Sequence, residues 1–499
     1  MDKFIHHMFR ILSYLGFPPD FCLTVNKEGS TYGKILLPGV YFSIAISLFS
    51  CTTQSSESEN QSAIQAQPPP NIILILADDL GAGDLACTGH PYVKTPNIDR
   101  LASDGIMFSN AYMAAAWCAP TRYSLMRGQF PARQFYQTYN LLPTEPSITK
   151  LLQDAGYATA HFGKWHMSRG DSISTDPGDF GLDAHFTTSS SGPGWTREQR
   201  QRPYHRAKTT DGYVDMTIDF IKENQDQPFY INLWVHPTHS YIDPSPEQLA
   251  VYEGLKVDIE DFKSSYQQQY LEFVSEYGNL DKAMQAYCAD ITGMDQAIGR
   301  LMAYLDQNNL SDNTILVFTS DNGPGPLTQQ IENRSVVKRF KERPTLLNSV
   351  GSAGIFRDRK LSIHEGGIHV PFIVKWPAST PAGRIDAKTV IGSVDWLPTI
   401  ASICGIELPD YNYDGVDMTA AFQGQETDRG KPLFWLENNG QAAILKGAWK
   451  GVIRQGEFSL YNVEQDPEED NDLRETYRDK AEEIRSELES WLNEVPEPV

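Results

Sequence analysis

The strongest indication of chemistry in the sequence lies between Cys118 and Gly128. Cys118 is followed by Pro120 and, four positions after the cysteine, by Arg122. Because residues i and i+4 are neighbours on an α-helix, we expect the thiol and the guanidinium to share one helix face. The sulfur would then lie at a helix start, where N–H groups and the dipole favour an anionic substrate or a nucleophile of low pKa. Taken alone, the pattern also fits a buried cysteine beside a helix-start proline.

Oxygen donors follow two apolar runs, residues 71–77 and 314–320. Continuous hydrophobicity predicts strands buried on both faces, as in a parallel sheet covered by helices, and sites in such folds open at the carboxyl ends of the strands. Carboxylates this close repel each other unless a cation lies between them, and an all-oxygen set selects Ca²⁺ or Mg²⁺. A pair of solvated turns is the alternative. The donors are Asp78, Asp79, Asp321 and Asn322.

The pattern Cys118-x-Pro120-x-Arg122 resembles the signature of the type I sulfatases, the formylglycine-dependent, arylsulfatase-like members of the alkaline phosphatase superfamily. In that family the cysteine is oxidised to Cα-formylglycine by a maturation enzyme, and Arg122 would steady the modified residue. The resemblance implies Ca²⁺ rather than Mg²⁺, because a charge-rich site tolerates the larger ion's irregular coordination. The metal ligands that the resemblance implies are Asp78, Asp79, modified Cys118, Asp321 and Asn322.

Two further segments supply histidines and a lysine that the family uses. One ends in Gly-Lys-Trp-His, with Lys164 and His166 two residues apart, so on an extended segment they would point the same way. The strand expected at 229–235 is followed by two histidines. The family usually reads Pro-His here, which favours His239 although Thr238 replaces the proline, with His236 as the second choice. A packed core histidine is the alternative.

The second sulfate-binding lysine is expected at Lys360, four residues before Glu-Gly-Gly, as in the family. Two features depart from the family pattern. Asp358 and Arg359 stand where glycines are usual, and His369 stands where arginine is usual. An exposed surface lysine is the alternative interpretation of Lys360.

The resemblance also implies a mechanism. Sulfate ester cleavage requires neutralised sulfate oxygens and an oxygen nucleophile near neutral pH. An unmodified cysteine would form a thiosulfate-like adduct with no easy release, whereas a hydrated aldehyde solves that step. In the family, a hydroxyl of this hydrate, activated by the metal and Asp321, attacks sulfur while His239 protonates the leaving alcohol. Lys164 and Lys360 hold the sulfate, and His166 accepts the proton that lets sulfate leave.

The fold class that the resemblance implies is α/β and alkaline-phosphatase-like. A large, mixed but mostly parallel sheet flanked by helices would form the catalytic domain, residues 71–425. From 426 to 499 the sequence changes to short alternating runs and a charged segment at about 475–494. These features predict a small C-terminal α+β subdomain, an antiparallel sheet plus a helix.

The first 70 residues differ in kind from the rest. Residues 35–50 are almost uncharged and end at Cys51 in a sequence that resembles a bacterial lipobox, which predicts a lipoprotein-type signal peptide over 1–51. Residues 52–70 are Ser/Gln/Glu-rich and close with prolines, as in a flexible tether. We therefore expect an exported protein in the bacterial periplasm or on the outer surface, held to the membrane only by a lipid on Cys51. An ordinary signal peptide cut nearby is the alternative.

Composition excludes several function classes. The 499 residues carry a formal net charge of −22, and removing residues 1–51 takes away four basic and three acidic residues, which gives −23. Such acidity argues against nonspecific nucleic-acid binding. Three cysteines remain after Cys118 and the leader, and an odd number does not make a disulfide framework. They are Cys87, Cys288 and Cys404.

Two basic loops could select the substrate. One runs from Trp195 and Arg197 to Lys208 and the other from Arg334 to Arg343, each after a segment that carries expected site residues. We expect them to rim the pocket and bind a sulfated carbohydrate, with an aromatic ring on a sugar face. Solvated loops that balance nearby acids are the alternative. Two rival functions also stay open, a phosphonate or phosphodiester hydrolase of the same superfamily and a non-catalytic sulfated-glycan-binding protein.

Overall fold

The computed structural model divides the chain into two units, Met1–Gln67 and Pro68–Val499. In the first unit the described residues form a three-stranded antiparallel sheet of β1 (Cys22–Val25), β2 (Thr31–Lys34) and β3 (Ser43–Ile44). The described residues of the second unit are 68–134, 141–167, 176–188, 196, 198–199, 202, 204–239, 242–326, 349–437 and 439–496. The proposed lipobox at Cys51 and most of the tether lie outside the described residues. No described helix has the length and apolarity to cross a membrane.

An eight-stranded sheet forms the centre of the second unit, in the order β11-β5-β10-β9-β4-β8-β6-β7. β10 runs antiparallel to both of its neighbours, and the other pairings are parallel. This arrangement confirms the prediction of a mixed, mostly parallel sheet. The strands are β4 (Asn71–Asp78), β5 (Ile106–Tyr112), β6 (Ala158–Lys164), β7 (Ala184–Thr188), β8 (Phe229–Thr238), β9 (Thr314–Ser320), β10 (Phe372–Lys375) and β11 (Arg384–Gly392).

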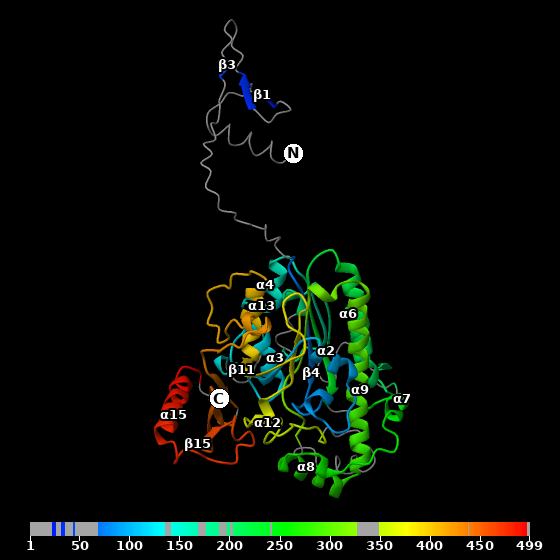
Figure 1. Ribbon diagram of the computed structural model, residues 1–499, viewed down its shortest axis with the longest axis vertical. Coiled ribbons are helices and arrows are strands. Elements are labelled where there is room, and N and C mark those ends of the chain that lie inside the picture. Colours follow the sequence, from blue (N-terminus) through cyan, green and yellow to red (C-terminus); the bar gives the residue numbers. More distant parts are fainter. Residues whose placement is uncertain are drawn as a thin grey trace, which may run out of the picture. The chain divides into compact units, whose positions relative to one another are not determined.

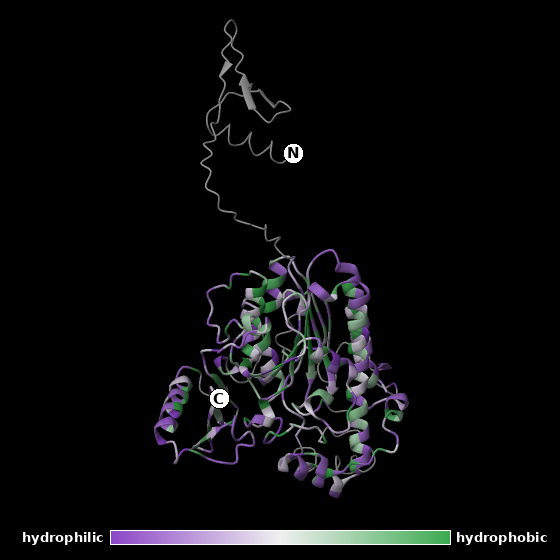
Figure 2. Ribbon diagram, viewed as in Figure 1, coloured by the Kyte–Doolittle hydropathy of each residue, from purple (hydrophilic) through white to green (hydrophobic). Residues whose placement is uncertain are grey.

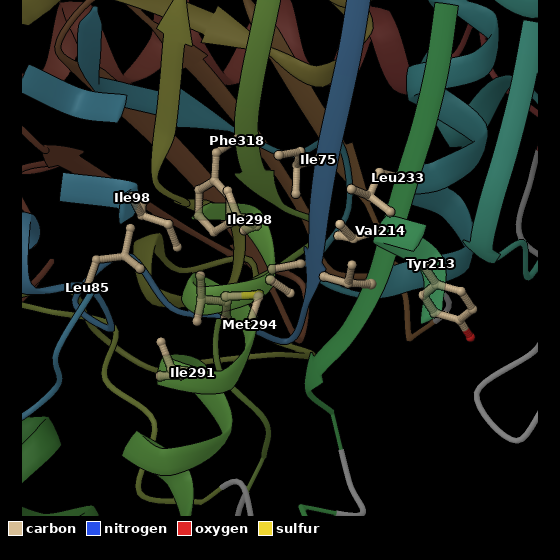
Figure 3. Close-up of a cluster of buried hydrophobic side chains, with 14 of the residues drawn as sticks. Ile75, Leu85, Ile98, Tyr213, Val214, Leu233, Ile291, Met294, Ile298 and Phe318 are labelled. Atoms are coloured by element: carbon tan, nitrogen blue, oxygen red, sulfur yellow. The ribbon is translucent and has the colours of Figure 1, made fainter. Parts of the chain in front are cut away.

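Helices cover both faces of this sheet (Figure 1). On one face, α9 (Leu280–Gln307) packs Ile291, Met294 and Ile298 against Ile75 of β4 and Phe318 of β9 (Figure 3). That layer also includes α2 (Pro96–Ser103), α6 (Thr209–Asn224) and α8 (Ser265–Tyr277). The opposite face is covered by α3 (Cys118–Arg127), α4 (Ile148–Asp154) and α13 (Trp396–Ile403).

The central strand β4 shows why its sequence is continuously apolar. Ile73 and Ile75 belong to the core on the α9 side, whereas Ile72 and Leu74 belong to the core on the α3 side. All four side chains are completely buried. Each such side chain contributes about 1.5–3 kcal/mol relative to leaving it in water. In β4 the carboxylate Asp78 lies at the carboxyl end of the strand, beyond these apolar residues.

Shorter elements connect these layers. The short helices are α7 (Pro246–Ala250), α12 (Glu365–Ile368) and α14 (Thr419–Phe422). The 3₁₀ turns are η1 (Ala86–Thr88), η2 (Pro131–Arg133), η3 (Pro177–Phe180), η4 (Arg206–Lys208), η5 (Ile259–Asp261), η6 (Ser311–Asn313) and η8 (Ser393–Asp395). Within the described residues, the four cysteines Cys87, Cys118, Cys288 and Cys404 form no disulfide.

The C-terminal part is a four-stranded antiparallel sheet with one helix, as predicted. Its strands are β12 (Leu433–Leu436), β13 (Ala442–Lys446), β14 (Trp449–Arg454) and β15 (Glu457–Asn462), and its helix is α15 (Arg478–Leu492). α15 is largely hydrophilic in Figure 2, but it buries Ile484, Leu488 and Trp491. The Trp491 ring stacks on Phe434 of β12, with centroids 4.7 Å apart.

A buried ion cluster joins this small sheet to the large one. Lys450 of β14 is completely buried and donates to Glu365 of α12 at 2.8 Å, and its amine lies 3.1 Å from Glu469. Burial would raise the pKa of Glu365, but the positive charge of Lys450 and a hydrogen bond from His369 lower it to about 2. The segment that follows Lys360 is therefore fixed to the C-terminal sheet by charge as well as by packing.

Candidate active site

The two predicted oxygen pairs meet because β4 and β9 are parallel neighbours, with Ala77 opposite Ser320. The Asp79 N–H donates to Asp321 Oδ1 at 3.1 Å, and Asn322 Nδ2 donates to Asp79 Oδ1 at 2.9 Å. Asp79 has a φ of 64°, so the chain turns sharply where the strand ends. Four oxygen-bearing side chains from positions some 240 residues apart thus form one buried cluster.

The helix that carries the predicted nucleophile begins at Cys118, and all ten of its residues are buried. Ligand atoms of Cys118, Asp78 and Asp321 all lie within 4.8 Å of one another. Arg122 lies on the same side of α3, as expected from the i, i+4 spacing, and its Nη2 donates to Asp321 Oδ2 at 2.5 Å. The guanidinium also lies over the ring of Trp234, 5.2 Å from its centroid.

Both predicted lysines reach this cluster. Lys164, at the end of β6, is completely buried, and its Nζ donates to both oxygens of Asp78 at 2.8 Å. Lys360 donates to Asp79 Oδ1. Burial would raise the pKa of Asp78, but the charges of Lys164, His239 and Arg122 hold it well below its usual range. The amines that would bind an anionic substrate are therefore already held at the cluster by carboxylates.

Asp321 differs from the other two carboxylates in its proton affinity. Burial and the negative charges of Asp78 and Asp79 raise its pKa to about 6, although the adjacent Arg122 opposes the shift. Burial would also raise the pKa of Asp79, but the charges of Lys360 and His239 lower it, so the cluster contains two carboxyls of lowered pKa and one that binds a proton more readily.

His166 lies beside the cysteine, with Nδ1 3.3 Å from Cys118 Sγ. His166 does not lie on an extended segment with Lys164, as was predicted. β6 ends at Lys164, and His166 has a φ of 56°, so a left-handed turn rather than strand alternation directs its ring to the site. Burial, with the charges of Lys164 and Arg122, lowers the pKa of His166 to about 3. The imidazole is therefore neutral near pH 7.

The two histidines after β8 have different surroundings. His239 Nε2 lies 3.9 Å from Asp79 Oδ2, and 23% of its side chain is exposed. His236 is buried, and its Nε2 is within hydrogen-bond distance of Thr188 Oγ1 and Tyr213 Oη, 3.0 Å from each. The structure therefore places His239, the preferred candidate, at the cluster and His236 beside it in the core.

The departures from the family pattern near Lys360 have structural explanations. Asp358 has a φ of 62°, the left-handed conformation that glycine adopts without strain. Arg359 is buried and donates to the carbonyls of Gly325, Ser349 and Gly351, so it braces the loop. His369 stacks on Phe356, with ring centroids 4.1 Å apart, and its Nδ1 is hydrogen-bonded to Glu365. These contacts are not with the carboxylates of the cluster.

Glycine is required where the Lys360 segment meets the end of β9. A Cβ on Gly323 would lie 1.8 Å from the Gly366 carbonyl oxygen, and the Gly323 N–H donates to Gly367 at 3.0 Å. Only glycine permits this approach, which brings Lys360 to Asp79. The predicted Glu-Gly-Gly motif thus has a packing role beside the site.

Comparison with known proteins identifies the family of the chain. The Sulfatase family model matches residues 70–406, more than half of the chain. The chain belongs to the sulfatase family. It is 29% identical over 430 residues to N-acetylgalactosamine-6-sulfatase of Canis lupus familiaris, an alignment that covers 78% of this chain and 72% of the relative. It is 27% identical over 530 residues to N-acetylgalactosamine-6-O-sulfatase of Bacteroides thetaiotaomicron, with 91% and 98% covered.

A solved structure supports the same assignment. The crystal structure of Ps i-CgsB in complex with k-i-k-neocarrahexaose has a TM-score of 0.70 and 25% sequence identity, with 86% of this sulfatase and 94% of that chain covered. Family and fold agree, so the sulfatase is a sulfuric ester hydrolase of the alkaline phosphatase superfamily.

The donor set of the sulfatase fits a hard divalent cation. Asn322 donates through its nitrogen, while its Oδ1 is buried and has no hydrogen-bond partner among the described residues. A buried amide oxygen without a partner costs about 1–3 kcal/mol, which coordination to a cation would remove. Asp78, Asp79 and Asp321 add carboxylate oxygens within the same cluster. Oxygen ligands of this kind suit Ca²⁺ or Mg²⁺.

The predicted basic loops are only partly described. Trp195, Arg197 and residues 334–343 lie outside the described residues. Of the first loop, Arg202 is exposed and lies 3.4 Å from Glu198. Arg206 instead donates from Nη2 to the His239 carbonyl at 2.9 Å, so it supports the histidine itself.

Three contacts at the site were not predicted from the sequence, although Arg206 lies in the first basic loop, which is expected to rim the pocket. Trp234 supports the Arg122 guanidinium, Arg206 holds His239, and Thr238 Oγ1 donates to the Asp79 carbonyl at 2.9 Å. Thr238 was noted only because it replaces the usual proline, and that departure was the one available signal. Trp234 has none, because Arg122 is distant in sequence, and the signal for Arg206 was the basic composition of its loop.

Proposed function

We propose that the sulfatase hydrolyses sulfate esters of carbohydrates through a formylglycine made from Cys118, together with a divalent cation. The observation that carries the proposal is the single buried cluster around Cys118. It combines the cysteine at a helix start, an oxygen-donor set, two lysines and two histidines. These are the groups that cleavage of an anionic ester requires: neutralising cations, a nucleophile and proton donors or acceptors.

The cation would be held by side chains of β4, β9 and α3, and we propose Ca²⁺ with Mg²⁺ as the alternative. When bound, the cation supplies positive charge to the sulfate oxygens, and the formylglycine supplies an oxygen nucleophile that can release its product. The residues that would hold the cation are Asp78, Asp79, Cys118 in its modified form, Asp321 and Asn322.

The other side chains divide the remaining work. Lys164 and Lys360 bind sulfate oxygens, which places two fixed positive charges where negative charge develops. His239, at the partly exposed edge of the cluster, donates a proton to the leaving alcohol. His166, neutral and next to position 118, accepts the proton whose removal lets sulfate leave. Arg122 fixes Asp321 and the helix that carries the nucleophile.

Relatives support a carbohydrate substrate. Two relatives are named for the 6-sulfate of N-acetylgalactosamine, and the solved neighbour binds the oligosaccharide k-i-k-neocarrahexaose. The first basic loop would help to determine the sugar and the position of its sulfate. In this loop, Trp195 would contact the sugar and Arg197 would contact a sulfate.

An assay with two ester types separates the rival functions. The matured enzyme, with and without EDTA, is incubated with 4-nitrophenyl sulfate and with an aryl phosphonate monoester. A sulfatase is expected to prefer the sulfate by at least about 100-fold in kcat/KM, or about 2.7 kcal/mol in transition-state binding. Preference for the phosphonate would favour the related hydrolase, and turnover of neither substrate would favour a glycan-binding protein.

The first basic loop is expected to control KM for large substrates. Changing Arg197, Arg200 and Arg202 together to glutamine should raise KM for a sulfated oligosaccharide about tenfold, because attraction and hydrogen bonds to its sulfates are lost. Turnover of 4-nitrophenyl sulfate should stay within about twofold. Arg206 is left unchanged, because it holds His239.

A control triplet tests whether net charge alone explains the effect. Arg478 and Arg485 on α15 are exposed and Lys480 is partly exposed, and changing these three residues to glutamine alters the net charge by the same amount. The control should leave both substrates unaffected. Equal losses on both substrates in the loop variant would contradict a role in glycan recognition.

We also propose that the sulfatase is exported and lipid-anchored at Cys51. The lipobox-like sequence and the tether-like composition of 52–70 support this. Expression in a Gram-negative host with labelled palmitate should give a labelled membrane-bound protein, and Cys51→Ser should lose both the label and the membrane association. Label retained in Cys51→Ser would contradict the proposed anchor.

A further inference from the structure

The helix that begins at Cys118 lacks the usual side-chain N-cap. Its N-cap residue is Trp117, which has an extended backbone (φ −158°, ψ 161°). Within the described residues, the Trp117 side chain makes no capping hydrogen bond to the first turn of the helix. Helix starts are normally fixed by a side-chain oxygen that accepts from the first turn. Here the chain entering the helix is held by a residue from a different part of the fold.

That residue is Glu437, in the turn between β12 and β13 of the C-terminal sheet. Its Oε1 accepts from the Ala116 N–H at 3.2 Å, and its carboxylate also hydrogen-bonds to the Trp117 side chain. Glu437 is itself fixed by its backbone, because its N–H donates to the Gln441 carbonyl at 2.8 Å. Glu437, held by this backbone hydrogen bond, therefore contacts both of the residues that precede the nucleophile.

The same short segment is held from its other side by the Lys360 loop. The Leu361 N–H donates to the Ala116 carbonyl at 2.8 Å. Leu361 adopts a φ of 75°, and its side chain is 42% exposed. A left-handed leucine is unfavourable for its own backbone, so its conformation points to an external contact that holds it. Ala116 is thus fixed through both of its backbone groups, one toward Glu437 and one toward the residue after Lys360.

Glu437 is an unusual choice for such a contact, because it is only 7% exposed. Burial raises its pKa to about 7, although the hydrogen bonds from Ala116 and Trp117 oppose the shift. A carboxyl group buried at such a cost needs hydrogen-bond partners, and Ala116 and Trp117 supply them. Both hydrogen bonds go to the approach of α3, which makes the start of that helix the part of the molecule that depends on Glu437.

We propose that Glu437 is a positioning residue that sets the place of residue 118 relative to Lys360. The C-terminal sheet then contributes to catalysis without touching the substrate, by fixing the segment from which the nucleophile projects. A displacement of about 1 Å between reacting groups can cost about 100-fold in rate. This inference rests on the proposed role of Cys118.

The test compares the kcat of two substitutions of Glu437. If the charge of Glu437 matters, the variant that keeps the charge should be the more active, and if its position matters, the variant that keeps the side-chain length should be the more active. Glu437→Gln keeps an acceptor oxygen at the same distance and loses the charge. Glu437→Asp keeps the charge but is one methylene shorter and cannot reach Ala116. We expect Glu437→Gln to retain at least a third of kcat for 4-nitrophenyl sulfate, and Glu437→Asp to lose at least about 30-fold in kcat with KM within about threefold. Rates are normalised to the aldehyde content of residue 118 by peptide mass spectrometry.

A matched control separates position from stability. Asn462, at the end of β15, is also buried, and its side-chain oxygen accepts from the Gln465 N–H at 3.2 Å. Asn462→Ala removes a side-chain contact to Gln465 and none to the segment before α3, so it should keep normal kcat when assayed well below its melting temperature. The proposal would be overturned if Asn462→Ala lost activity in proportion to its fall in melting temperature. It would also be overturned if kcat were higher in Glu437→Asp than in Glu437→Gln.

The wild-type protein distinguishes this failure from failure of the proposed function. If wild type carries no aldehyde, or if Cys118→Ala stays active, the role of Cys118 itself is wrong. If wild type carries the aldehyde and Cys118→Ala is inactive, an unfavourable result for the Glu437 variants overturns only the positioning role.

Discussion

Changing Cys118 to alanine is expected to reduce sulfate ester turnover by about 10⁴-fold or more, because removal of a covalent nucleophile leaves only the binding and electrostatic groups. The fold should survive, since Cys118 begins α3 and alanine is a good helix former. Steady-state assays of purified protein with 4-nitrophenyl sulfate measure the loss, and circular dichroism checks the fold. Full activity in this variant would contradict the assignment of the nucleophile.

The same prediction has a chemical readout in wild-type protein. The tryptic peptide that contains residue 118 should show the mass of an aldehyde in place of the thiol when the protein is made together with a maturation enzyme. Cys288→Ala provides the control, because this cysteine is also completely buried but belongs to the α9 core. In wild-type protein, the peptide that contains Cys288 should have the mass expected for an unmodified cysteine. The Cys288→Ala variant should remain active.

Local sequence was sufficient to predict the central strands and the position of the oxygen donors. The apolar runs at 71–77 and 314–320 are strands with both faces buried, and the oxygen donors follow at their carboxyl ends. Cys118 and Arg122 could be placed together because helix periodicity is a local property. The fold class, including the C-terminal sheet and helix, followed from the family resemblance and from the change in sequence texture after residue 425.

The remaining features depend on contacts between distant parts of the chain. The antiparallel direction of β10 is set by its neighbours β5 and β9, and its own sequence does not encode it. The left-handed turn at His166 and the contact of Glu437 with Ala116 are also invisible in local patterns, since the second joins positions 321 residues apart. At Asp358 and Thr238 the sequence signal was a departure from the family pattern, because these residues stand where glycine and proline are usual.

Charge explains how an acidic protein can hold an anionic ester. The net charge of −22 acts over the whole surface and is screened beyond about 8–10 Å in physiological salt. In the cluster, Lys164, Lys360 and Arg122 lie against the carboxylates within hydrogen-bond distance. The local balance at the site, rather than the net charge, therefore determines whether sulfate binds there.

Changing Asp321 to alanine is expected to leave a folded protein that binds Ca²⁺ at least about 100-fold more weakly and has lost at least about 10³-fold in kcat/KM. Asp321 connects three parts of the site, because it accepts from the Asp79 N–H and from Arg122, and its carboxylate belongs to the cluster with Cys118. Its loss removes a proposed ligand and leaves the Arg122 charge without its nearest carboxylate partner.

Calorimetric titration of Ca²⁺ into EDTA-treated protein measures the affinity, and added Ca²⁺ should restore activity to wild type but not to Asp321→Ala. Asp84→Asn is the matched control. Asp84 is also a completely buried carboxyl group near β4, but it accepts from Gly81, Ser352 and Tyr287. Its variant should keep the Ca²⁺ affinity of wild type within about threefold. Normal Ca²⁺ binding and turnover in Asp321→Ala would mean that the oxygen pairs at the ends of β4 and β9 hold the turns together and do not hold a cation.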